Sequence, residues 1–451
     1  MVTALYFERR NRFSSGFVDV EEEKLSEQDV RRKPIVIVGG GPAGATLALM
    51  LVQRGIGVVL VEASRDFARS FRGEALMPSG LDALETMGLL PLLNSLPTQT
   101  ISAWEFSVEG QPFFSVDEPM GSNRPCTLVS QAHFLAAVIA KAQQFEHFKF
   151  LQGEAVQELL WDGDRVSGVR LSGGLSGQPI EASLVVGCDG RGSIVRTKAG
   201  LTLNEEPKPF NILWFKIDSS ESSSPQSSHG SELDAIGLSS ISPNPFQVFV
   251  QGCNAFSVFR SSENQMQVGW VLSEDDRTWK DISDWRSHLA AASPVALAQY
   301  FQTLEHPIDR PLLLTVKVGR APQWSKSGCL LLGDAAHPMS PIRAQGINMA
   351  LRDATQATQA IAAAWAGSSD DELNVSIDRV LVNIQAMREP EICKMQELQA
   401  HEADDAAKLH NSALLRQIIK TFAPVIGPVI RQKWIRRQKL LRHGIQTLIL
   451  D

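Results

Sequence analysis

The sequence predicts an α/β fold (α+β in overall class): a Rossmann-like domain with an inserted antiparallel-sheet domain and C-terminal helices. The first observation is a buried apolar run over 35–38, a helical pattern over 43–54 and a second strand over 57–61. Such a βαβ unit implies two parallel strands joined by a right-handed crossover. The second observation is a series of short strand-like runs between 210 and 273, which favours an antiparallel sheet. The third is that the chain has a helical pattern throughout after Gly346.

Length and composition describe a globular protein of more than one domain. The chain has 451 residues, of which 43% are hydrophobic and 21% are charged. This length exceeds one ordinary hydrophobic core, so we expect two domains or one domain with a large insertion. The net charge of −7 argues against nucleic acid as a partner, because phosphate binding needs a basic surface.

Cysteine usage and the N-terminus predict a soluble, cytoplasmic protein. The five cysteines are scattered and form no CxxC pair, which fits a reducing compartment and argues against a disulfide framework or a zinc site. The sequence shows no cluster of metal ligands. Charges begin at Glu8, where a signal peptide would have an apolar core. No run of about 18 uninterrupted apolar residues predicts a transmembrane helix.

Changes in pattern divide the chain into four regions. The N-terminal region alternates charged and small residues without a period and is interpreted as a flexible extension. The Rossmann-like domain is expected to be discontinuous, because the sheet domain, assigned to substrate binding, interrupts it twice. The regions are the extension (1–33), the Rossmann-like domain (34–101, 119–205 and 320–365), the sheet domain (102–118 and 206–319) and a C-terminal helical region (366–451).

A glycine motif follows the first predicted strand, where residues 39–44 read GGGPAG and satisfy GxGxxG. The first glycine allows a tight turn, the second lets the backbone approach a pyrophosphate, and the third lets the helix pack closely on the strand. The phosphates would lie at the helix N-terminus, where free N–H groups favour anions. An acid ends the second strand, where it can accept ribose hydroxyls. The candidate dinucleotide-binding residues are Gly39, Gly41, Pro42, Ala43, Gly44 and Glu62.

Two further motifs follow buried strands. One is GCDGRGSIVR over 187–196, and the other is GDAAHPMSPIRAQGIN over 333–348. Together with GxGxxG they resemble, in the same order, the three fingerprints of the class A flavoprotein monooxygenases, the para-hydroxybenzoate hydroxylase-like family. The resemblance covers roughly residues 34–365. It implies that the bound dinucleotide is FAD and that the Rossmann-like domain is an FAD-binding domain.

The resemblance assigns roles within the third motif. Asp334, after Gly333, matches the acid that hydrogen-bonds the ribityl chain of FAD, and Pro341 matches the proline beside the isoalloxazine and the substrate. The segment Gly346-Ile347-Asn348 matches the helix start beneath the flavin N1–C2=O edge. This last role also has a physical basis, because reduced flavin is an anion at N1 and a helix N-terminus stabilises negative charge.

Three more residues match cofactor-binding positions of the family, each with a plainer alternative. Arg72 resembles the arginine near the pyrophosphate, with an ordinary surface arginine as the alternative. Gln131 resembles the side chain that touches the flavin, but after a serine it also fits the first turn of a capped helix. Asp189 matches the acid that the family links to both FAD and NAD(P)H, although Asp-Gly is also a common turn.

The role of Arg343 is open, because the family more often has a small residue at this position. Its cation could bind an anionic or carbonyl-bearing substrate or stabilise reduced flavin, and the alternative is a solvent-directed side chain that holds the loop. With Pro341 it is the candidate for a catalytic role. His337, in the same loop, is interpreted as a structural residue packed behind the turn.

Tyrosine is scarce in this chain, and three tryptophans fall on predicted strands of the substrate domain. The whole chain has two tyrosines, so the tyrosine relay of family members that hydroxylate simple phenols is not expected. These residues, Trp104, Trp214 and Trp270, either fill the core or line an apolar cavity.

The resemblance implies an FAD-dependent monooxygenase. NADPH or NADH would reduce FAD, and O2 would then form a C4a-hydroperoxyflavin that hydroxylates or epoxidises an apolar or aromatic small molecule. Three alternatives are a flavin-dependent alkene reductase like the geranylgeranyl reductases, a flavin-dependent halogenase, and a non-catalytic flavin-binding redox partner. The segment Gly73-Glu74-Ala75 weakly resembles halogenases, but their W-x-W-x-I-P signature is absent.

The C-terminal tail differs in charge from the rest of the chain. Between residues 411 and 451, eight Lys and Arg occur with one acid, among Leu, Ile and Val and interrupted by two prolines. Such a tail is expected to pack its apolar side on the acidic body. The alternative is weak contact with an anionic membrane surface.

Overall fold

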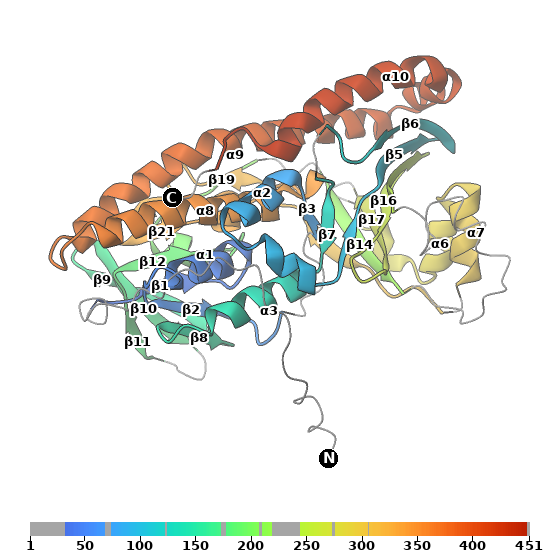
Figure 1. Cartoon of the computed structure of the whole chain (residues 1–451). Coiled ribbons are helices and arrows are strands. Elements are labelled where there is room, and N and C mark those ends of the chain that lie inside the picture. Colours follow the sequence, from blue (N-terminus) through green and yellow to red (C-terminus); the bar gives the residue numbers. More distant parts are fainter. Residues whose placement is uncertain are drawn as a thin grey trace, which may run out of the picture.

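The computed structural model in Figure 1 describes residues 32–67, 74–121, 124–172, 177–206, 210–218, 244–272, 276–304 and 306–448. A Rossmann-like domain and a seven-stranded sheet lie side by side, and two long helices run across both (Figure 1). The predicted α/β fold class is therefore confirmed.

The Rossmann-like domain is built on a six-stranded sheet. In spatial order its strands are β20 (Ser325–Lys326), β21 (Cys329–Leu331), β12 (Leu184–Gly187), β1 (Ile35–Val38), β2 (Val58–Glu62) and β8 (Phe148–Gln152). Every neighbouring pair is parallel except β20 with β21. The central strand β1 reads IVIV and is buried throughout, as expected for a parallel strand covered on both faces.

Alternate residues of β1 face two different cores, because successive side chains of a strand point to opposite faces. Ile35 and Ile37 pack among the helices α1 (Pro42–Val52), α3 (Gln131–Ala142) and α8 (Gln345–Ala366). Val36 and Val38 pack against a small antiparallel sheet. Its strands are β9 (Ala155–Asp162), β10 (Arg165–Ser172) and β11 (Pro179–Glu181).

The second domain is built on a seven-stranded sheet. In spatial order its strands are β18 (Leu312–Thr315), β14 (Asn211–Ile217), β17 (Met266–Leu272), β16 (Asn254–Arg260), β15 (Phe246–Gln251), β5 (Ala103–Val108) and β6 (Gln111–Asp117). All pairs are antiparallel except β15 with β5. One face buries residues such as Phe215 and Trp270 beneath α6 (Trp285–Ala291) and α7 (Val295–Thr303). The opposite face carries Ile212 and Trp214.

Short elements join the two sheets. They are β3 (Ala75–Leu76), α2 (Pro78–Thr86), β4 (Thr98–Thr100), β7 (Thr127–Val129), α4 (Ile194–Lys198), β13 (Asn204–Glu205) and β19 (Gly319–Arg320). Single 3₁₀ turns or short 3₁₀ helices occur over Leu90–Ser95, Thr278–Asp281, Gly333–Ala335 and Ile342–Ala344.

The C-terminal region forms two long helices, α9 (Leu373–Asn411) and α10 (Ala413–His443), which run along both domains (Figure 1). They are antiparallel, since Arg437 of α10 pairs with Asp405 of α9 after the chain reverses at residue 412. The prediction that prolines interrupt this tail is wrong, because Pro424 and Pro428 lie within α10. Both prolines are exposed, so water can satisfy the carbonyl groups that they leave unpaired.

A buried network of charges joins α8 to α9. Arg388 donates to Asp353 at 2.8 Å and also pairs with Glu391, which accepts from Arg352 at 2.9 Å. His337 Nε2 lies 2.7 Å from Asp353 Oδ2. Burial alone would raise the pKa of Asp353, but His337 and Arg388 hold that pKa below its usual range. The network therefore stays ionised at neutral pH and fixes α9 on the Rossmann-like domain.

Two residues assigned to the flexible extension belong to the fold. Arg32 pairs with Asp370 at 2.7 Å, and Lys33 pairs with Glu181 at 3.1 Å. The fold thus includes these two residues, which lie before the predicted boundary. Two predicted features lie outside the described residues: the segment 1–31 and Arg72. The segment SSESSSPQSSHGS over 219–231, whose polar composition predicts a loop, lies outside them as well.

Replacing Arg388 with Leu should destabilise the protein. The carboxylates of Asp353 and Glu391 would stay buried without their shared cation, so we expect the free energy of unfolding to fall by about 3–5 kcal/mol. Lys394→Leu, which breaks an exposed pair with Glu397 on the same helix, should cost less than about 0.5 kcal/mol. Chemical denaturation of both variants measures the difference. Equal stabilities would contradict the structural role of the network.

Candidate active site

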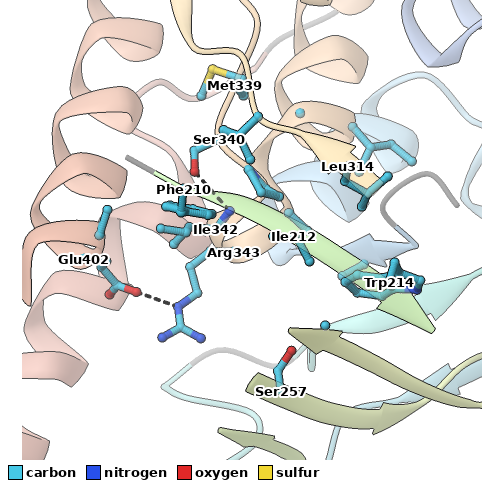
Figure 2. Close-up of a pocket in the computed structure, with 18 of the residues that line it drawn as sticks. Phe210, Ile212, Trp214, Ser257, Leu314, Met339, Ser340, Ile342, Arg343 and Glu402 are labelled. Carbon is cyan, nitrogen blue, oxygen red and sulfur yellow. Dashed lines mark hydrogen bonds and ion pairs between the residues drawn. The ribbon is translucent and has the colours of Figure 1, made fainter. Parts of the chain in front are cut away.

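A cavity of about 1430 Å³ lies between the two domains. The Rossmann-like domain contributes the glycine turn after β1, the end of β2, and the loop between β21 and α8. The seven-stranded sheet contributes its open face, and α9 and α10 close a further side. Figure 2 shows the part where Ile342 and Arg343 of the loop, Ile212 and Trp214 of β14, and Glu402 of α9 surround one space.

The glycine turn after β1 has the geometry of a pyrophosphate site. Gly39 has φ +103°, and a Cβ there would lie 2.4 Å from the carbonyl oxygen of Cys188. A Cβ on Gly44 would lie 2.0 Å from the carbonyl oxygen of Gly39, so the close packing of α1 requires glycine. No side chain caps α1, so its first N–H groups are available to an anion. The residues of this turn that line the cavity are Gly39, Gly41, Pro42 and Ala43.

Glu62 ends β2 beside the glycine turn and lines the cavity. Its carboxylate accepts hydrogen bonds from the N–H groups of Gly40 and Ser64, each at 2.7 Å. These bonds hold the carboxylate at the sheet edge. A carboxylate at this position can accept the ribose hydroxyls of a dinucleotide.

Asp189 also lines the cavity, but its carboxylate serves the adjacent helix. It accepts hydrogen bonds from Ser193 Oγ at 2.5 Å, Ile194 N at 2.7 Å and Val195 N at 3.1 Å. Burial raises the pKa of Asp189 in spite of these bonds. The side chain therefore shapes the turn before α4, in agreement with the turn interpretation, and holds the backbone of this loop against the cavity.

Asp334 and Pro341 lie on the cavity wall in the loop that follows β21, as does Gly333. Asp334 Oδ2 accepts a hydrogen bond from Arg191 Nε at 3.2 Å, and Arg191 also donates to the backbone oxygen of Thr315 at 2.9 Å. A partly exposed carboxylate is therefore held at the cavity by a cation from the second motif. It can accept hydroxyl groups of a ribityl chain.

The N-terminus of α8 points into the same cavity. Ala344 precedes the helix in the left-handed conformation, with φ +50°, and no side chain caps the first turn. Gly346 and Ile347 line the cavity. Because the first N–H groups of a helix lack internal partners, this turn can stabilise negative charge on a ring placed above it.

The side chain of Asn348 lies outside the cavity lining, unlike its two predecessors. It is fully buried, and its Oδ1 accepts from Met77 N at 2.9 Å while its Nδ2 donates to Ala75 O at 3.2 Å and Ala344 O at 2.7 Å. Its amide is thus occupied by the backbone of β3, α2 and the loop. Asn348 positions the helix start, and the cavity contacts of this segment come from Gly346 and Ile347.

Two buried polar side chains carry unpaired oxygens on the cavity wall. Gln131 Oε1 and Glu74 Oε2 have no hydrogen-bond partner among the described residues, and both residues line the cavity. Burial raises the pKa of Glu74 to about 7. Because these two oxygens belong to residues of the cavity wall, a bound ligand with donor groups would satisfy them. The residues present therefore fit a dinucleotide that extends along this wall.

Arg343 joins the loop to the C-terminal helices. Its Nε donates to Glu402 at 2.8 Å, and its guanidinium lies 4.9 Å from the ring centroids of both Trp104 and Trp434. The side chain is 10% exposed, so the solvent-directed alternative is wrong, although the residue does hold the loop. These contacts offset a left-handed backbone at Arg343 and Ala344, which have φ +57° and +50°.

Two other predicted residues lie outside the cavity. His337 is buried behind the loop with its ring 4.9 Å from that of Trp324, which is the structural role expected for it. Trp270 packs beneath α6, whereas Trp104 and Trp214 line the cavity. The three tryptophans therefore divide between the two interpretations given to them.

Comparison with known proteins agrees with this geometry. The family described as FAD binding domain matches residues 32–405. The chain belongs to this family. It is 31% identical over 330 residues to 6-methylpretetramide 4-monooxygenase of Streptomyces rimosus, covering 72% of this chain and 73% of the relative. It is 26% identical over 443 residues to the ubiquinone hydroxylase UbiL of Rhodospirillum rubrum, covering 92% and 90%.

Solved structures share the fold. PqsL of Pseudomonas aeruginosa, in complex with 2-aminobenzoylacetate, superposes with a TM-score of 0.67 at 20% identity, covering 84% of this chain and 99% of PqsL. A 2-methyl-3-hydroxypyridine-5-carboxylic acid oxygenase superposes with a TM-score of 0.65 at 20% identity, covering 85% and 94%. The resemblance to class A flavoprotein monooxygenases is thus confirmed, and the protein is an FAD-dependent monooxygenase that uses NAD(P)H. No feature described above favours the reductase, halogenase or non-catalytic alternatives.

Sequence reasoning missed two parts of the site. Glu74 was considered only for its resemblance to halogenases, and its burial depends on distant segments. The wall formed by the C-terminal helices was predicted only as a tail packed on the body. The cavity-lining residues of that wall include Glu402, Leu415, Ile419, Ile426, Ile430 and Trp434.

Asp334→Ala should give protein that purifies largely without FAD. The substitution removes the carboxylate that is placed for the ribityl hydroxyls, and charge-assisted hydrogen bonds of this kind contribute about 1.5–3 kcal/mol each. Asp370→Ala, which removes an exposed partner of Arg32 outside the cavity, should retain full flavin. The flavin-to-protein absorbance ratio measures both. Full FAD content in Asp334→Ala would contradict the assignment.

Proposed function

We propose that the protein hydroxylates a large, apolar aromatic small molecule with O2 and NAD(P)H. The size and lining of the cavity support this proposal most directly. At about 1430 Å³ it exceeds the roughly 300–1,000 Å³ of ordinary small-molecule pockets. Because the same cavity includes the dinucleotide-binding turn, it has room for the whole of FAD and, beside the flavin ring, for a substrate of several rings or with a long alkyl chain.

The substrate side of the cavity is mostly apolar. The open face of the seven-stranded sheet and the inner side of α10 supply aromatic and branched aliphatic side chains. Ser257, Arg343 and Glu402 are polar residues of the part shown in Figure 2, and Asp405, Lys433 and Arg437 add charges from the C-terminal helices. Such a surface binds by excluding water from apolar rings. The apolar lining includes Trp104, Phe106, Phe114, Phe210, Ile212, Trp214, Phe246, Phe259, Val271, Leu314, Ile419 and Trp434.

The chain's own residues would hold and orient the reactants. Bound FAD, reduced by NAD(P)H, would supply the redox chemistry and the activation of O2. The turn at 39–44 and Glu62 would hold the dinucleotide, and Asp334 the ribityl chain. The first turn of α8 would stabilise negative charge on the ring. Pro341 and Ile342 would lie beside the ring and the substrate, where apolar walls exclude water.

The names of the relatives agree with an aromatic substrate. They include a monooxygenase of 6-methylpretetramide, a ubiquinone hydroxylase and the complex of PqsL with 2-aminobenzoylacetate. These compounds differ from one another, so they support the chemical class and not one substrate. The apolar lining and large volume favour the larger members of that class.

The proposal is tested with FAD-loaded protein and isotope-labelled O2. Polycyclic phenols and alkyl-substituted hydroxyquinolines should stimulate NADPH or NADH oxidation and yield products with one labelled oxygen. Simple phenol serves as the size control and should give little stimulation. A product that gains two hydrogens without labelled oxygen would identify an alkene reductase, and product formation only with added halide would identify a halogenase. Either result, or a preference for simple phenol, would contradict the proposal.

Arg343→Ala should weaken substrate binding while FAD is retained. The guanidinium lines the cavity, and loss of a hydrogen bond to a charged group corresponds to a rise in KM of about tenfold or more. Glu402→Gln is the matched variant, because it removes the partner's charge and leaves the cation in place. If Arg343 contacts an anionic or carbonyl group of the substrate, Glu402→Gln should not raise KM. An unchanged KM in Arg343→Ala would contradict a role in substrate binding and would show that Arg343 only holds the loop.

A further inference from the structure

The outer side of α10 carries an apolar stripe. Its members are 42–73% exposed and follow one another at spacings of four, four, three and four residues, which places them on one face of the helix. Isolated exposed apolar residues are ordinary, but a continuous row is not. The stripe consists of Leu414, Ile418, Phe422, Val425 and Val429.

The opposite side of α10 is fixed to the protein at both ends. Near its start Arg416 pairs with Glu109 at 2.7 Å, and near its end the fully buried Arg442 pairs with Glu118 through Nη2 at 2.6 Å. Within the described residues α10 is the helix long and apolar enough to cross a membrane by length and composition. A helix that crosses the bilayer alone has lipid on all sides, whereas these ion pairs keep one side of α10 on the two domains. The stripe can therefore enter a lipid surface only with the helix axis in the plane of that surface.

Cations continue the same face. Lys433 and Arg436 lie four and seven residues after Val429, and Lys439 follows on the edge of this face. All three cations are exposed and form no ion pair with a described carboxylate. The helix contains no acidic residue, although the whole chain has a net charge of −7. One face of α10 therefore carries cations next to exposed apolar side chains, although the protein as a whole is acidic. This face complements a lipid surface, in which anionic headgroups lie above an apolar interior.

The cavity reaches the surface at this helix. Ile430 lines the cavity and is also 39% exposed, and the exposed Lys433 lines the cavity one turn later. The inner side of α10 therefore borders the apolar cavity while its outer side carries the stripe. A molecule dissolved among lipid chains would meet the cavity where α10 touches the membrane.

We propose that α10 docks this protein on an anionic membrane surface, with the stripe among the acyl chains and the cations against lipid phosphates. A second copy of the chain suits this face less well. If two α10 helices paired in parallel, like cations would oppose one another. If they paired antiparallel about the stripe, the cations of each helix would extend past the stripe of the other. They would find no carboxylate there, because α10 contains none. The docking surface does not depend on the identity of the proposed substrate.

Vesicle flotation of the FAD-loaded protein tests the proposal. We expect binding to vesicles of phosphatidylcholine with a minority of phosphatidylglycerol, weak binding to phosphatidylcholine alone, and release by salt. Phe422→Ser/Val425→Ser/Val429→Ser should weaken binding on the order of a hundredfold or more. Its control is Val375→Ser/Val382→Ser, two substitutions of exposed residues on α9, which should bind like the unmodified protein.

A second variant tests the cations. Arg436→Gln/Lys439→Gln should weaken binding to the anionic vesicles about twenty-five-fold, or about fivefold for each cation. Its control is Lys149→Gln/Lys198→Gln, two exposed lysines of the Rossmann-like domain. All variants should keep full FAD content, because none of these residues lines the cavity.

Three results would overturn the proposal. The first is no binding of the FAD-loaded protein to either type of vesicle. The second is binding that the stripe variant and the cation variant leave unchanged. The third is a dimer in solution that the stripe substitutions dissociate, without vesicle binding, which would assign the face to a second copy of the chain.

Discussion

One buried carboxylate, that of Asp353 on α8, holds the active-site loop and the C-terminal helices together. Its Oδ2 accepts from the N–H of Gly333 at 3.1 Å and lies 2.7 Å from His337 Nε2, while its Oδ1 accepts from Arg388 Nε at 2.8 Å. The first two contacts fix the turn that presents Asp334, and the third fixes α9. Because α10 follows α9 directly in the chain, the same carboxylate also helps to position the cavity wall that these two helices form.

The loop beyond this turn is held by a second set of charges. Arg343 and Ala344 adopt left-handed backbone conformations, which cost on the order of 1–3 kcal/mol each for residues other than glycine. The ion pair to Glu402 and the cation–π contacts with Trp104 and Trp434 oppose this cost. The loop can therefore keep the first turn of α8 uncapped and directed at the cavity. The C-terminal helices thus support the flavin side of the site as well as the substrate side.

Much of the fold follows from local pattern. The strands β1 and β2 and the helix after the glycine turn were predicted within about two residues, because side-chain period and turn residues act between near neighbours. The strand-like runs between 210 and 273 form β14 to β17 of the second sheet, whereas its edge strand β18 was not predicted. Most of the predicted motif residues also line the cavity in the structure. The side chain of Asn348 does not line the cavity. Its hydrogen-bond partner, the N–H of Met77, is 271 positions away in the sequence, so local pattern could not predict this contact. Trp214 and Trp270 looked alike on their strands, and the packing of α6 and α7 on one face alone separates them.

The sequence alone was sufficient for the dinucleotide turn and the order of the elements, since these rest on short motifs and patterns whose geometry is local. The FAD-dependent chemistry was implied by the family resemblance that three such motifs carry. The cavity, the aromatic surroundings of Arg343 and the exposed side of α10 arise only on folding. Each is made by segments that are far apart in the chain, and the apolar residues of α10 show no preference in sequence for the inner or the outer face. Packing against β6 and α9 buries Ile419 and Trp434 and leaves Phe422 and Val425 outside. Long-range contacts, and not local pattern, thus set which of these residues meet substrate and which meet the surroundings of the protein.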